Sequence, residues 1–247
     1  MKVTSAARAK RLLAVVAHPD DESFGLGALL AEASTAGWSI GVLCATHGEA
    51  STLHGVAGDL HAVRELELRR AAQHLGVSWV RLLDHPDGAL ADQADTWVDD
   101  VAAAVAQFRP DLLLTFDPNG ITGHADHIAA TRAALGVGRV HGVPVLAWGL
   151  PPHVVQDLAD EGVRGFVPQP DDVPTLTVAV DRTAQRRAIE EHPSQAVPGS
   201  PLWRRLELLG DVEHLRWLHS LPATPVPFRV LRAGRVEGRA TSAAAAP

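Results

Sequence analysis

Histidines and acidic residues that could bind a metal ion are grouped in two short stretches of the sequence. His18 is followed, after one proline, by the adjacent acids Asp20 and Asp21, and His124 and His127 lie three positions apart. Two histidines and one carboxylate with open positions form a catalytic arrangement for Zn²⁺ and also for Fe²⁺. Within each stretch, one group could bind the metal while its neighbour faces a bound water or donates a proton. The two stretches together predict a catalytic metal site.

Each stretch also has a purely structural interpretation. A His-Asp pair in a loop is commonly a turn or capping device, and Asp126 at the start of a helix would interact favourably with the helix dipole. This interpretation explains either stretch alone. It does not explain why both stretches follow predicted strands in one α/β chain, so the metal site is the favoured interpretation.

The elements that would position these residues follow from the hydrophobic pattern. Short apolar runs bounded by polar loops are typical of buried strands, and amphipathic segments that stop at glycine or proline are typical of helices. The expected strands are residues 12–17, 39–45, 79–83, 111–116 and 144–148, and the expected helices are residues 25–36, 59–75 with Asp59 as cap, 92–108 and 125–135. This alternation predicts a Rossmann-like, doubly wound α/β fold, in which helices cover both faces of a mainly parallel sheet.

The second part of the chain has a less regular pattern. Strands are expected at 175–180 and 228–231 and helices at 183–191 and 203–209, separated by proline-rich joints. Since no segment resembles a linker, one domain is expected over residues 10–239, with residues 12–150 as the core and residues 151–239 as a C-terminal α+β extension. Residues 1–9 and 240–247 are expected to be disordered tails.

Polar residues gather behind the expected strands. In an open parallel sheet, ligands bind outside the carboxyl ends of the strands. Metal-competent or polar residues follow four successive strands, at positions 18–22, 46–49, 84–88 and 117–127. One crevice could therefore hold them all.

Composition excludes several classes of function. The formal net charge of -7 argues against a general affinity for nucleic acid or anionic membrane, and the low aromatic content of 4% argues against a base-stacking surface. The single cysteine, Cys44, excludes an intrachain disulfide and a cysteine-rich zinc finger. No apolar run approaches the roughly 18 residues of a membrane span. We expect a cytoplasmic protein whose partner is a small molecule, and the sequence does not determine its oligomeric state.

The two metal-competent motifs carry a family resemblance. Residues 17–23 (AHPDDES) and 123–127 (GHADH) resemble the LmbE-like, or phosphatidylinositol-glycan-type, N-deacetylases. Weaker matches at residues 46–49, 64–71, 86–88 and 187–195 extend the resemblance over most of the chain. That family includes zinc enzymes that remove N-acetyl or other N-acyl groups from amino sugars, among them deacetylases of mycothiol, bacillithiol and glycosylphosphatidylinositol biosynthesis.

The resemblance implies a zinc-dependent hydrolase that deacylates a small polar amino-sugar conjugate. Two other functions stay open. The same residues could cleave thiol conjugates or an N-acylated antibiotic precursor, or the scaffold could serve a non-catalytic sugar-binding protein. The absence of an apparent membrane anchor disfavours the lipid-linked branch of the family.

The resemblance also implies a role for each matched residue. The implied zinc ligands are His18, Asp21 and His127. Asp20 matches the general base, His124 the electrophile or general acid, and Asp126 the residue that orients His124 and favours its charged form. The positions that match substrate contacts are Ser23, Glu49, Arg64 and Asp87.

Three of these expectations have alternatives or departures. Arg64 could instead pair with Glu67 along a solvated helix face, and Asp87 could cap a turn. Some relatives carry a tyrosine two residues before the histidine that matches His124. Thr122 occupies that position, and the chain contains no tyrosine. A phenol therefore cannot stabilise the oxyanion in this chain, so zinc and His124 would act alone or another donor would substitute.

Overall fold

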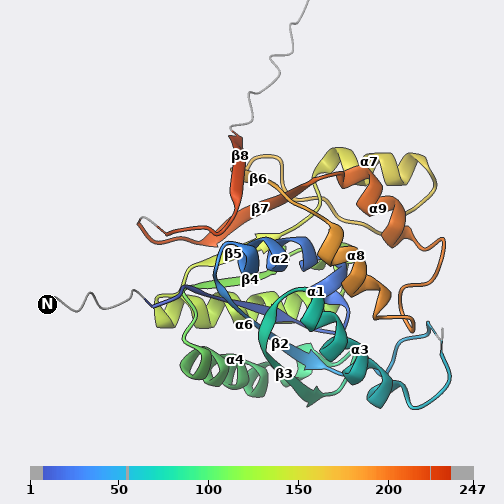
Figure 1. Cartoon of the computed structure of the whole chain (residues 1–247), viewed down its shortest axis with the longest axis horizontal. Coiled ribbons are helices and arrows are strands. Elements are labelled where there is room, and N and C mark those ends of the chain that lie inside the picture. The colour runs from blue at the N-terminus through green and yellow to red at the C-terminus, as the bar shows by residue number, and fades with distance from the viewer. Residues whose placement is uncertain (1–7, 54–55, 223, 235–247) are drawn as a thin grey trace, which may run out of the picture.

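The computed structural model describes residues 8–53, 56–222 and 224–234 of the 247-residue chain. Within these residues, eight strands form one sheet in the order β3-β2-β1-β4-β5-β7-β6-β8 (Figure 1). The first five strands in the chain run parallel: β1 (Arg11–Val16), β2 (Ser39–Thr46), β3 (Val77–His85), β4 (Leu112–Phe116) and β5 (Val145–Trp148). The doubly wound, mainly parallel architecture is confirmed.

Side chains of β1 show why the sheet is covered on both faces. Leu12 and Val16 belong to one apolar cluster and Leu13 and Val15 to another, and all four are buried. Successive side chains of a strand point to opposite faces, so a continuous apolar run is stable only between two helical layers. One layer contains α2 (Gly27–Thr35) and α3 (Leu60–His74), and the other contains η1 (Leu90–Gln93), α4 (Ala94–Phe108) and α6 (Ala125–His141).

The C-terminal extension continues the same sheet. β7 (Val212–His219) pairs antiparallel with β5, and β6 (Thr175–Ala179) pairs antiparallel with β7 and with β8 (Arg229–Gly234). Three helices accompany these strands: α7 (Pro152–Asp160), α8 (Thr183–Glu190) and α9 (Pro201–Leu209). Pro152 and Pro201 open α7 and α9 at a position where the missing amide proton is not needed.

Several elements differ from the expectation. β7 and α7 are not predicted by the sequence pattern, α6 runs to His141 instead of residue 135, and β3 spans nine residues instead of five. Two short helices, α1 (Asp21–Phe24) and α5 (Gly120–Gly123), occupy segments expected to be loops. The expected disorder of the tails lies almost wholly outside the described residues. Among the helices that the structure describes, none combines the length and apolar character needed to cross a bilayer.

Candidate active site

A cavity of about 530 Å³ lies at the carboxyl ends of the parallel strands. Its lining includes residues that follow β1, β2, β3 and β4, for example Asp20, Ser51, Asp87 and His127. β1 pairs with β2 on one side and with β4 on the other, so the chain crosses to the opposite half of the sheet at this point. Such a switch point leaves a crevice between the loops. The expectation that one crevice joins the four loops is confirmed.

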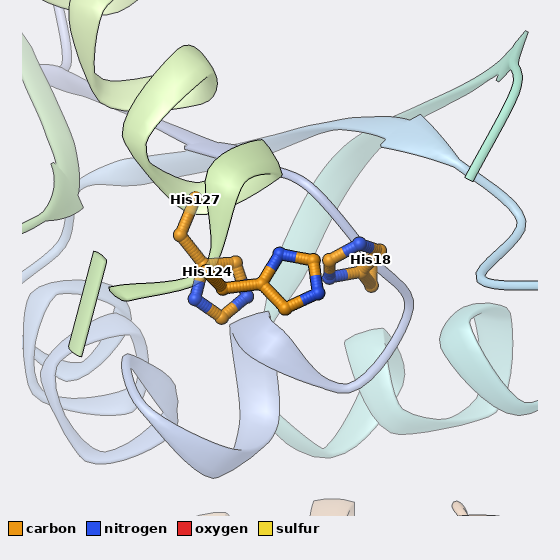
Figure 2. Close-up of side chains that lie close together, drawn as sticks. All are labelled: His18, His124 and His127. Carbon is orange, nitrogen blue, oxygen red and sulfur yellow. The ribbon is translucent and has the colours of Figure 1, made fainter. Parts of the chain in front are cut away.

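Three of the residues that line the cavity are histidines, and their side chains lie close together (Figure 2). His18 follows β1, His124 is the N-cap of α6, and His127 lies in the first turn of that helix. One ring nitrogen of each lies within 4.8 Å of the others. The residues at 124 and 127 share a helix face because positions three apart are neighbours on a helix. A side-chain group that could hold a metal ion is therefore present.

Asp21 connects two of these histidines. Its Oδ1 lies 3.1 Å from His127 Nε2, and its Oδ2 lies 3.7 Å from His18 Nδ1. The Asp21 Oδ2 atom also accepts hydrogen bonds from the backbone amides of Ala17 and His18, at 3.1 and 2.9 Å. Burial raises the pKa of Asp21, but the charges and hydrogen bonds of His127 and His18 outweigh it and hold the pKa far below its usual range. Asp21 is therefore an ionised carboxylate.

Hydrogen bonds to the outer nitrogens fix the orientation of both rings. His127 Nδ1 donates to the Gly120 carbonyl at 3.0 Å, and His18 Nε2 lies 3.0 Å from Asp87 Oδ1 and 3.4 Å from Asp126 Oδ2. His127 Nε2 and His18 Nδ1 are thereby directed at Asp21. Metal-binding histidines are commonly oriented by acceptors that bind the other ring nitrogen. The nitrogens of His18 and His127 and the carboxylate of Asp21 therefore fit a metal ion.

Without a bound cation, the pKa values of His18 and His127 are raised, so both rings bind a proton more readily than an ordinary histidine. Burial lowers the pKa of His18, but its hydrogen bonds with Asp126 and Asp87 outweigh burial and raise the pKa to about 10. Burial also lowers the pKa of His127, whereas the charge and hydrogen bond of Asp21 raise it above its ordinary value. The site therefore has a strong electrostatic preference for positive charge.

Asp20 lies beside this group in an unusual backbone conformation. Its φ of 122° is in the region that favours glycine, and Ile121 on the opposite loop has a φ of 65°. Strained residues of this kind cluster at functional sites. The Asp20 amide donates to Glu22 Oε2 at 2.9 Å. Burial raises the pKa of the Asp20 carboxyl to about 6, although the charge of Arg64 opposes the rise. Asp20 can therefore accept and release a proton close to neutral pH.

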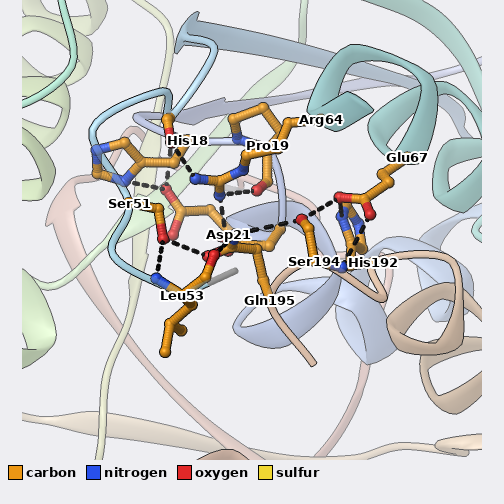
Figure 3. A network of polar contacts seen from close by, with 12 residues as sticks. His18, Pro19, Asp21, Ser51, Leu53, Arg64, Glu67, His192, Ser194 and Gln195 are labelled. Carbon is orange, nitrogen blue, oxygen red and sulfur yellow. Dashed lines mark hydrogen bonds and ion pairs between the residues drawn. The ribbon is translucent and has the colours of Figure 1, made fainter. Parts of the chain in front are cut away.

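Arg64 positions Asp20. This buried guanidinium donates to Asp20 Oδ2 at 2.8 Å and to the Gly48 carbonyl at 2.6 Å. It also donates to the Pro19 carbonyl (Figure 3). A side chain at Gly48 would collide with it, since an added Cβ would lie 2.0 Å from Arg64 Nη1. Arg64 lines the cavity, but most of its hydrogen-bonding capacity is used within the protein. The alternative pairing with Glu67 is wrong, because Glu67 binds Ser194.

A buried polar network supports the Asp20 loop from behind. Glu22 Oε1 accepts a hydrogen bond from Ser23 Oγ at 2.6 Å and lies 2.8 Å from His192 Nε2. Burial lowers the pKa of His192, but the charge of Glu22 outweighs burial and raises it. Ser23 is fully buried in this network and is not among the cavity-lining residues. The structure therefore does not bring Ser23 to the cavity with the other predicted residues, because α1 turns its side chain towards His192 in the segment after α8.

Glu49 and Asp87 hold the rim loops together. Glu49 Oε1 accepts a hydrogen bond from the Asp87 amide at 3.0 Å, and Asp87 Oδ2 accepts one from the Ala50 amide at 2.9 Å. Asp87 lines the cavity, whereas Glu49 is exposed and is not among the lining residues. A capping role for Asp87, the alternative to substrate contact, thus accounts for one of its oxygens, and the other faces His18.

His124 and Asp126 are arranged differently from the expectation. The Asp126 amide donates to His124 Nδ1 at 3.2 Å, whereas the Asp126 carboxylate accepts from the amides of Gly88 and Leu90, at 2.8 and 3.0 Å, and faces His18. Burial, together with the charges of His127 and His18, lowers the pKa of His124. In the structure the Asp126 carboxylate therefore orients His18, and it is the Asp126 amide that contacts the His124 ring. The lowered pKa favours the neutral ring, and because Nδ1 accepts a hydrogen bond, that neutral ring carries its proton on Nε2.

The sequence pattern did not predict the aromatic residues that line the cavity. An aromatic wall is formed by Phe24, Phe116, Trp148 and Phe166, next to Arg205. Gln195 Oε1 accepts a hydrogen bond from Ser51 at 2.8 Å and joins the late segment to the loop after β2 (Figure 3). Apolar residues carry no chemical signal in a sequence, so only their position identifies them. Thr122 lines the cavity where some relatives carry tyrosine.

A second group that could hold a metal lies outside the cavity lining. His47 Nε2 and His61 Nε2 lie 3.2 and 3.7 Å from Asp84 Oδ1, and the two rings are stacked. His47 is buried, whereas the side chain of His61 is partly exposed.

Comparisons with known proteins agree with this fold and site. The family model "PIG-L: GlcNAc-PI de-N-acetylase" matches residues 13–137. A 1D-myo-inositol 2-acetamido-2-deoxy-alpha-D-glucopyranoside deacetylase of Mycolicibacterium vanbaalenii is 32% identical over 93% of both chains. The Rhodococcus erythropolis protein of the same name is 28% identical over 76% of this chain and 82% of its own.

Solved structures of deacetylases share the fold. A triple mutant of a deacetylase of the teicoplanin biosynthetic pathway has a TM-score of 0.68 and 26% identity, covering 87% of this chain and all of its own. The antimicrobial reagent A40926 pseudoaglycone deacetylase has the same TM-score at 22% identity, covering 92% of this chain and all of its own. The fold and site define an α/β hydrolytic enzyme of the deacetylase class. The chain belongs to the GlcNAc-PI de-N-acetylase family, as the two sequence motifs predicted.

Proposed function

We propose that this protein is a metal-dependent N-deacetylase whose substrate is a small conjugate of N-acetylglucosamine. The observation that carries the proposal is the placement of the Asp20 carboxyl beside the group formed by His18, Asp21 and His127, in one cavity. The names of the mycobacterial and rhodococcal relatives support an amino-sugar conjugate as the substrate class.

We propose His18, Asp21 and His127 as the metal ligands. Two imidazole nitrogens and one carboxylate suit Zn²⁺, and they also suit Fe²⁺. When bound, such an ion lowers the pKa of a water molecule to about 7 and polarises the acyl carbonyl. Analysis of the metal content of protein purified without added metal would distinguish zinc from iron.

Asp20 is the proposed general base. Its carboxylate accepts the proton of the attacking water and later delivers a proton to the amine that leaves, because an amine departs more readily once it is protonated. Arg64 holds Asp20 Oδ2 at 2.8 Å and so restricts the carboxyl to one orientation. Arg64 is therefore a positioning residue in this proposal. Among the positions predicted to contact substrate, Asp87 is the one whose carboxylate lies in the cavity, and it stays a proposed substrate contact.

His124 is the proposed donor to the developing oxyanion. Its Nδ1 accepts the Asp126 amide, so its single proton is on Nε2. A preorganised neutral N–H that faces the substrate cavity can stabilise negative charge as it develops on the carbonyl oxygen. This arrangement supplies a donor in a chain that lacks the tyrosine found in some relatives. In this proposal the Asp126 carboxylate orients the His18 ring, and the Asp126 backbone amide orients the His124 ring.

The decisive experiment measures amine release from a panel of N-acetylglucosamine conjugates, with protein of known metal content. Asp20→Ala should lower kcat by about a hundredfold or more, in line with the contribution of a general base, while the metal content stays unchanged. Asp99→Ala, at an exposed position of α4, is the matched control and should have wild-type activity. Full activity of Asp20→Ala would reject the base assignment.

A second substrate class is an N-acylated antibiotic precursor. Two observations favour this class as a candidate substrate: the aromatic wall of the cavity, and the resemblance to a teicoplanin-pathway deacetylase. The same panel should therefore contain an N-acylglucosaminyl glycopeptide and a thiol conjugate of N-acetylglucosamine. A filled metal site without amine release from any of these would favour a sugar-binding role. A cytoplasmic location stays a prediction, which cell fractionation would test.

A further inference from the structure

Arg205 is a buried cation that faces the substrate cavity. It lies on α9, at 7% exposure, and it is among the residues that line the cavity. Its guanidinium carbon lies 5.3 Å from the centre of the Trp148 ring, and its Nη2 donates to the Phe24 carbonyl. The Nε atom is buried and has no hydrogen-bond partner.

No carboxylate neutralises Arg205 within the part of the chain that the structure describes. Glu213 is the acid whose charge acts most on it, but the oxygens of Glu213 are bound by Arg182 Nη1 at 2.5 Å and by Trp148 Nε1 at 2.6 Å. Burial lowers the pKa of Arg205 to about 10, and the charge of Glu213 offsets only part of that effect. The guanidinium is still protonated at neutral pH, and a buried unpaired charge is costly.

The acids of the metal group do not pair with it either. Asp20 is bound to Arg64 and Asp21 to His18 and His127, and their effect on Arg205 acts through space only. An anionic ligand in the cavity would lower the cost of burying Arg205. Aromatic rings on this wall make the surroundings of Arg205 less polar, and a low local dielectric constant strengthens such an interaction.

The cavity has room for more than the acyl group and its sugar amide. Its volume of about 530 Å³ falls in the range of roughly 300–1,000 Å³ that holds an entire small ligand. On the wall beside Arg205, Gly25 lets the aromatic rings approach the backbone, because an added Cβ there would lie 2.5 Å from the Phe116 ring and 3.2 Å from the Trp148 ring.

We propose that Arg205 is a specificity-determining residue that binds an oxyanion, a carboxylate or a phosphate, on the part of the substrate that is not the sugar. The inference rests on the proposed deacetylase function and narrows its substrate class to anionic conjugates. Trp148 and Phe24 would pack against the atoms that carry the anion. A second source of the same chemistry is the acetate released by the reaction, and the experiment separates the two.

The test uses two glycosides of N-acetylglucosamine that differ in one group. One carries glycolic acid as its aglycone, and the other carries the amide of glycolic acid. For the metal-loaded wild type, kcat/KM should be at least tenfold higher for the acid. Arg205→Gln should reduce this ratio to less than twofold, and Arg205→Lys, which keeps the charge, should retain a ratio above threefold. Because the readout is a ratio, a general loss of activity cancels.

Arg204→Gln is the matched control. Arg204 is the preceding residue of α9, but it is exposed and pairs with Glu161 and Glu207. Its replacement should leave the ratio unchanged. Equal kcat/KM for both glycosides in the wild type, or an undiminished ratio in Arg205→Gln, would overturn the assignment. Acetate inhibition that weakens in Arg205→Gln, with no preference between the glycosides, would assign Arg205 to the product instead and equally overturn it.

A binding measurement separates this inference from the proposed function. Calorimetry with metal-loaded Asp20→Asn compares the affinities of the two glycosides without turnover. Tighter binding of the acid, lost on adding Arg205→Gln, would support the anion site even if the wild type releases no amine. Equal binding together with turnover of both glycosides would reject the anion site and keep the deacetylase.

Discussion

Asp20 and Arg64 form an ion pair in the site, and Arg64 affects both the orientation and the pKa of Asp20. Arg64 was expected to contact substrate, but three of its contacts are to Asp20 and the carbonyls of Pro19 and Gly48. Without the guanidinium, the Asp20 carboxyl would lose both its orientation and the charge that opposes the rise of its pKa. The base and its partner therefore form one functional unit.

The pH dependence of activity should report this pair. Asp20 acts as a base only when ionised, and burial raises its pKa to about 6, so kcat/KM should fall as the pH drops through that region. Arg64→Gln removes a charge that lowers the pKa, and the acid limb should move to higher pH. Arg69→Gln, an exposed arginine of the same helix paired with Glu65, should leave the profile unchanged. An identical acid limb in Arg64→Gln would show that another group controls it.

Metal affinity should rise with pH. His18 and His127 have raised pKa values in the metal-free protein, and a metal ion binds only the neutral rings. Zinc binding should therefore release protons below about pH 10, and the apparent affinity should weaken as the pH falls. Calorimetry in two buffers of different ionisation enthalpy measures the proton count. Zinc binding without proton release would contradict the protonated state derived for these rings.

At the scale of elements, the segment after α8 forms hydrogen bonds that hold α1 and α3 in place near the site. The segment after α8 brings His192 to Glu22, and Glu22 in turn accepts the Asp20 amide. Ser194 binds Glu67 of α3 through its amide and its hydroxyl, at 3.0 and 2.6 Å. These bonds join α1, α3 and the segment after α8 around the base, so the segment that the sequence placed outside the core helps to shape the site.

His192→Gln should test this support. It leaves Glu22 buried without its cationic partner, which costs about 3 kcal/mol of unfolding free energy. Because the folded-state pKa of His192 is raised above its ordinary value of 6.5, its contribution to stability is complete below pH 6.5 and is lost as the pH rises through the folded-state pKa. Urea unfolding at pH 6 and pH 9 should therefore show a larger deficit at pH 6. His141→Gln, at an exposed position on α6, should show neither effect.

At the scale of the whole molecule, the extension and the core form one sheet. β7 joins β5, and the buried Glu213 of β7 binds Trp148 of β5 and Arg182 before α8. A unit that shares its sheet and a buried ion pair with the core should unfold with it. The single domain expected over residues 10–239 is thus a prediction with a physical basis.

Glu213→Gln should destabilise both parts together. The substitution keeps the shape but leaves Arg182 buried without its counter-charge, at a cost of about 3 kcal/mol. Urea unfolding followed by fluorescence and by circular dichroism should give coincident transitions in both wild type and variant. Glu207→Gln, an exposed partner of Arg204, is the control and should change little. Separate transitions for the two probes would reject the single unit.

The sequence by itself determined the class of fold and the reactive groups. Apolar runs and helix caps locate the five parallel strands because burial on both faces leaves a strong local pattern, and Asp59 caps α3 as expected. β7 was missed because its inward positions include Glu213, whose burial depends on Arg182 and Trp148 elsewhere in the chain.

Only the tertiary structure decided how the reactive groups are used. Ser23 and Arg64 match family positions for substrate contact, yet Ser23 faces a buried network and Arg64 faces Asp20. The Asp126 carboxylate faces His18 rather than His124, and Arg205 reaches the cavity from a helix remote in sequence. The physical reason is that hydrogen-bond partners and burial depend on residues brought together by packing, whereas a motif specifies only residue types and their spacing.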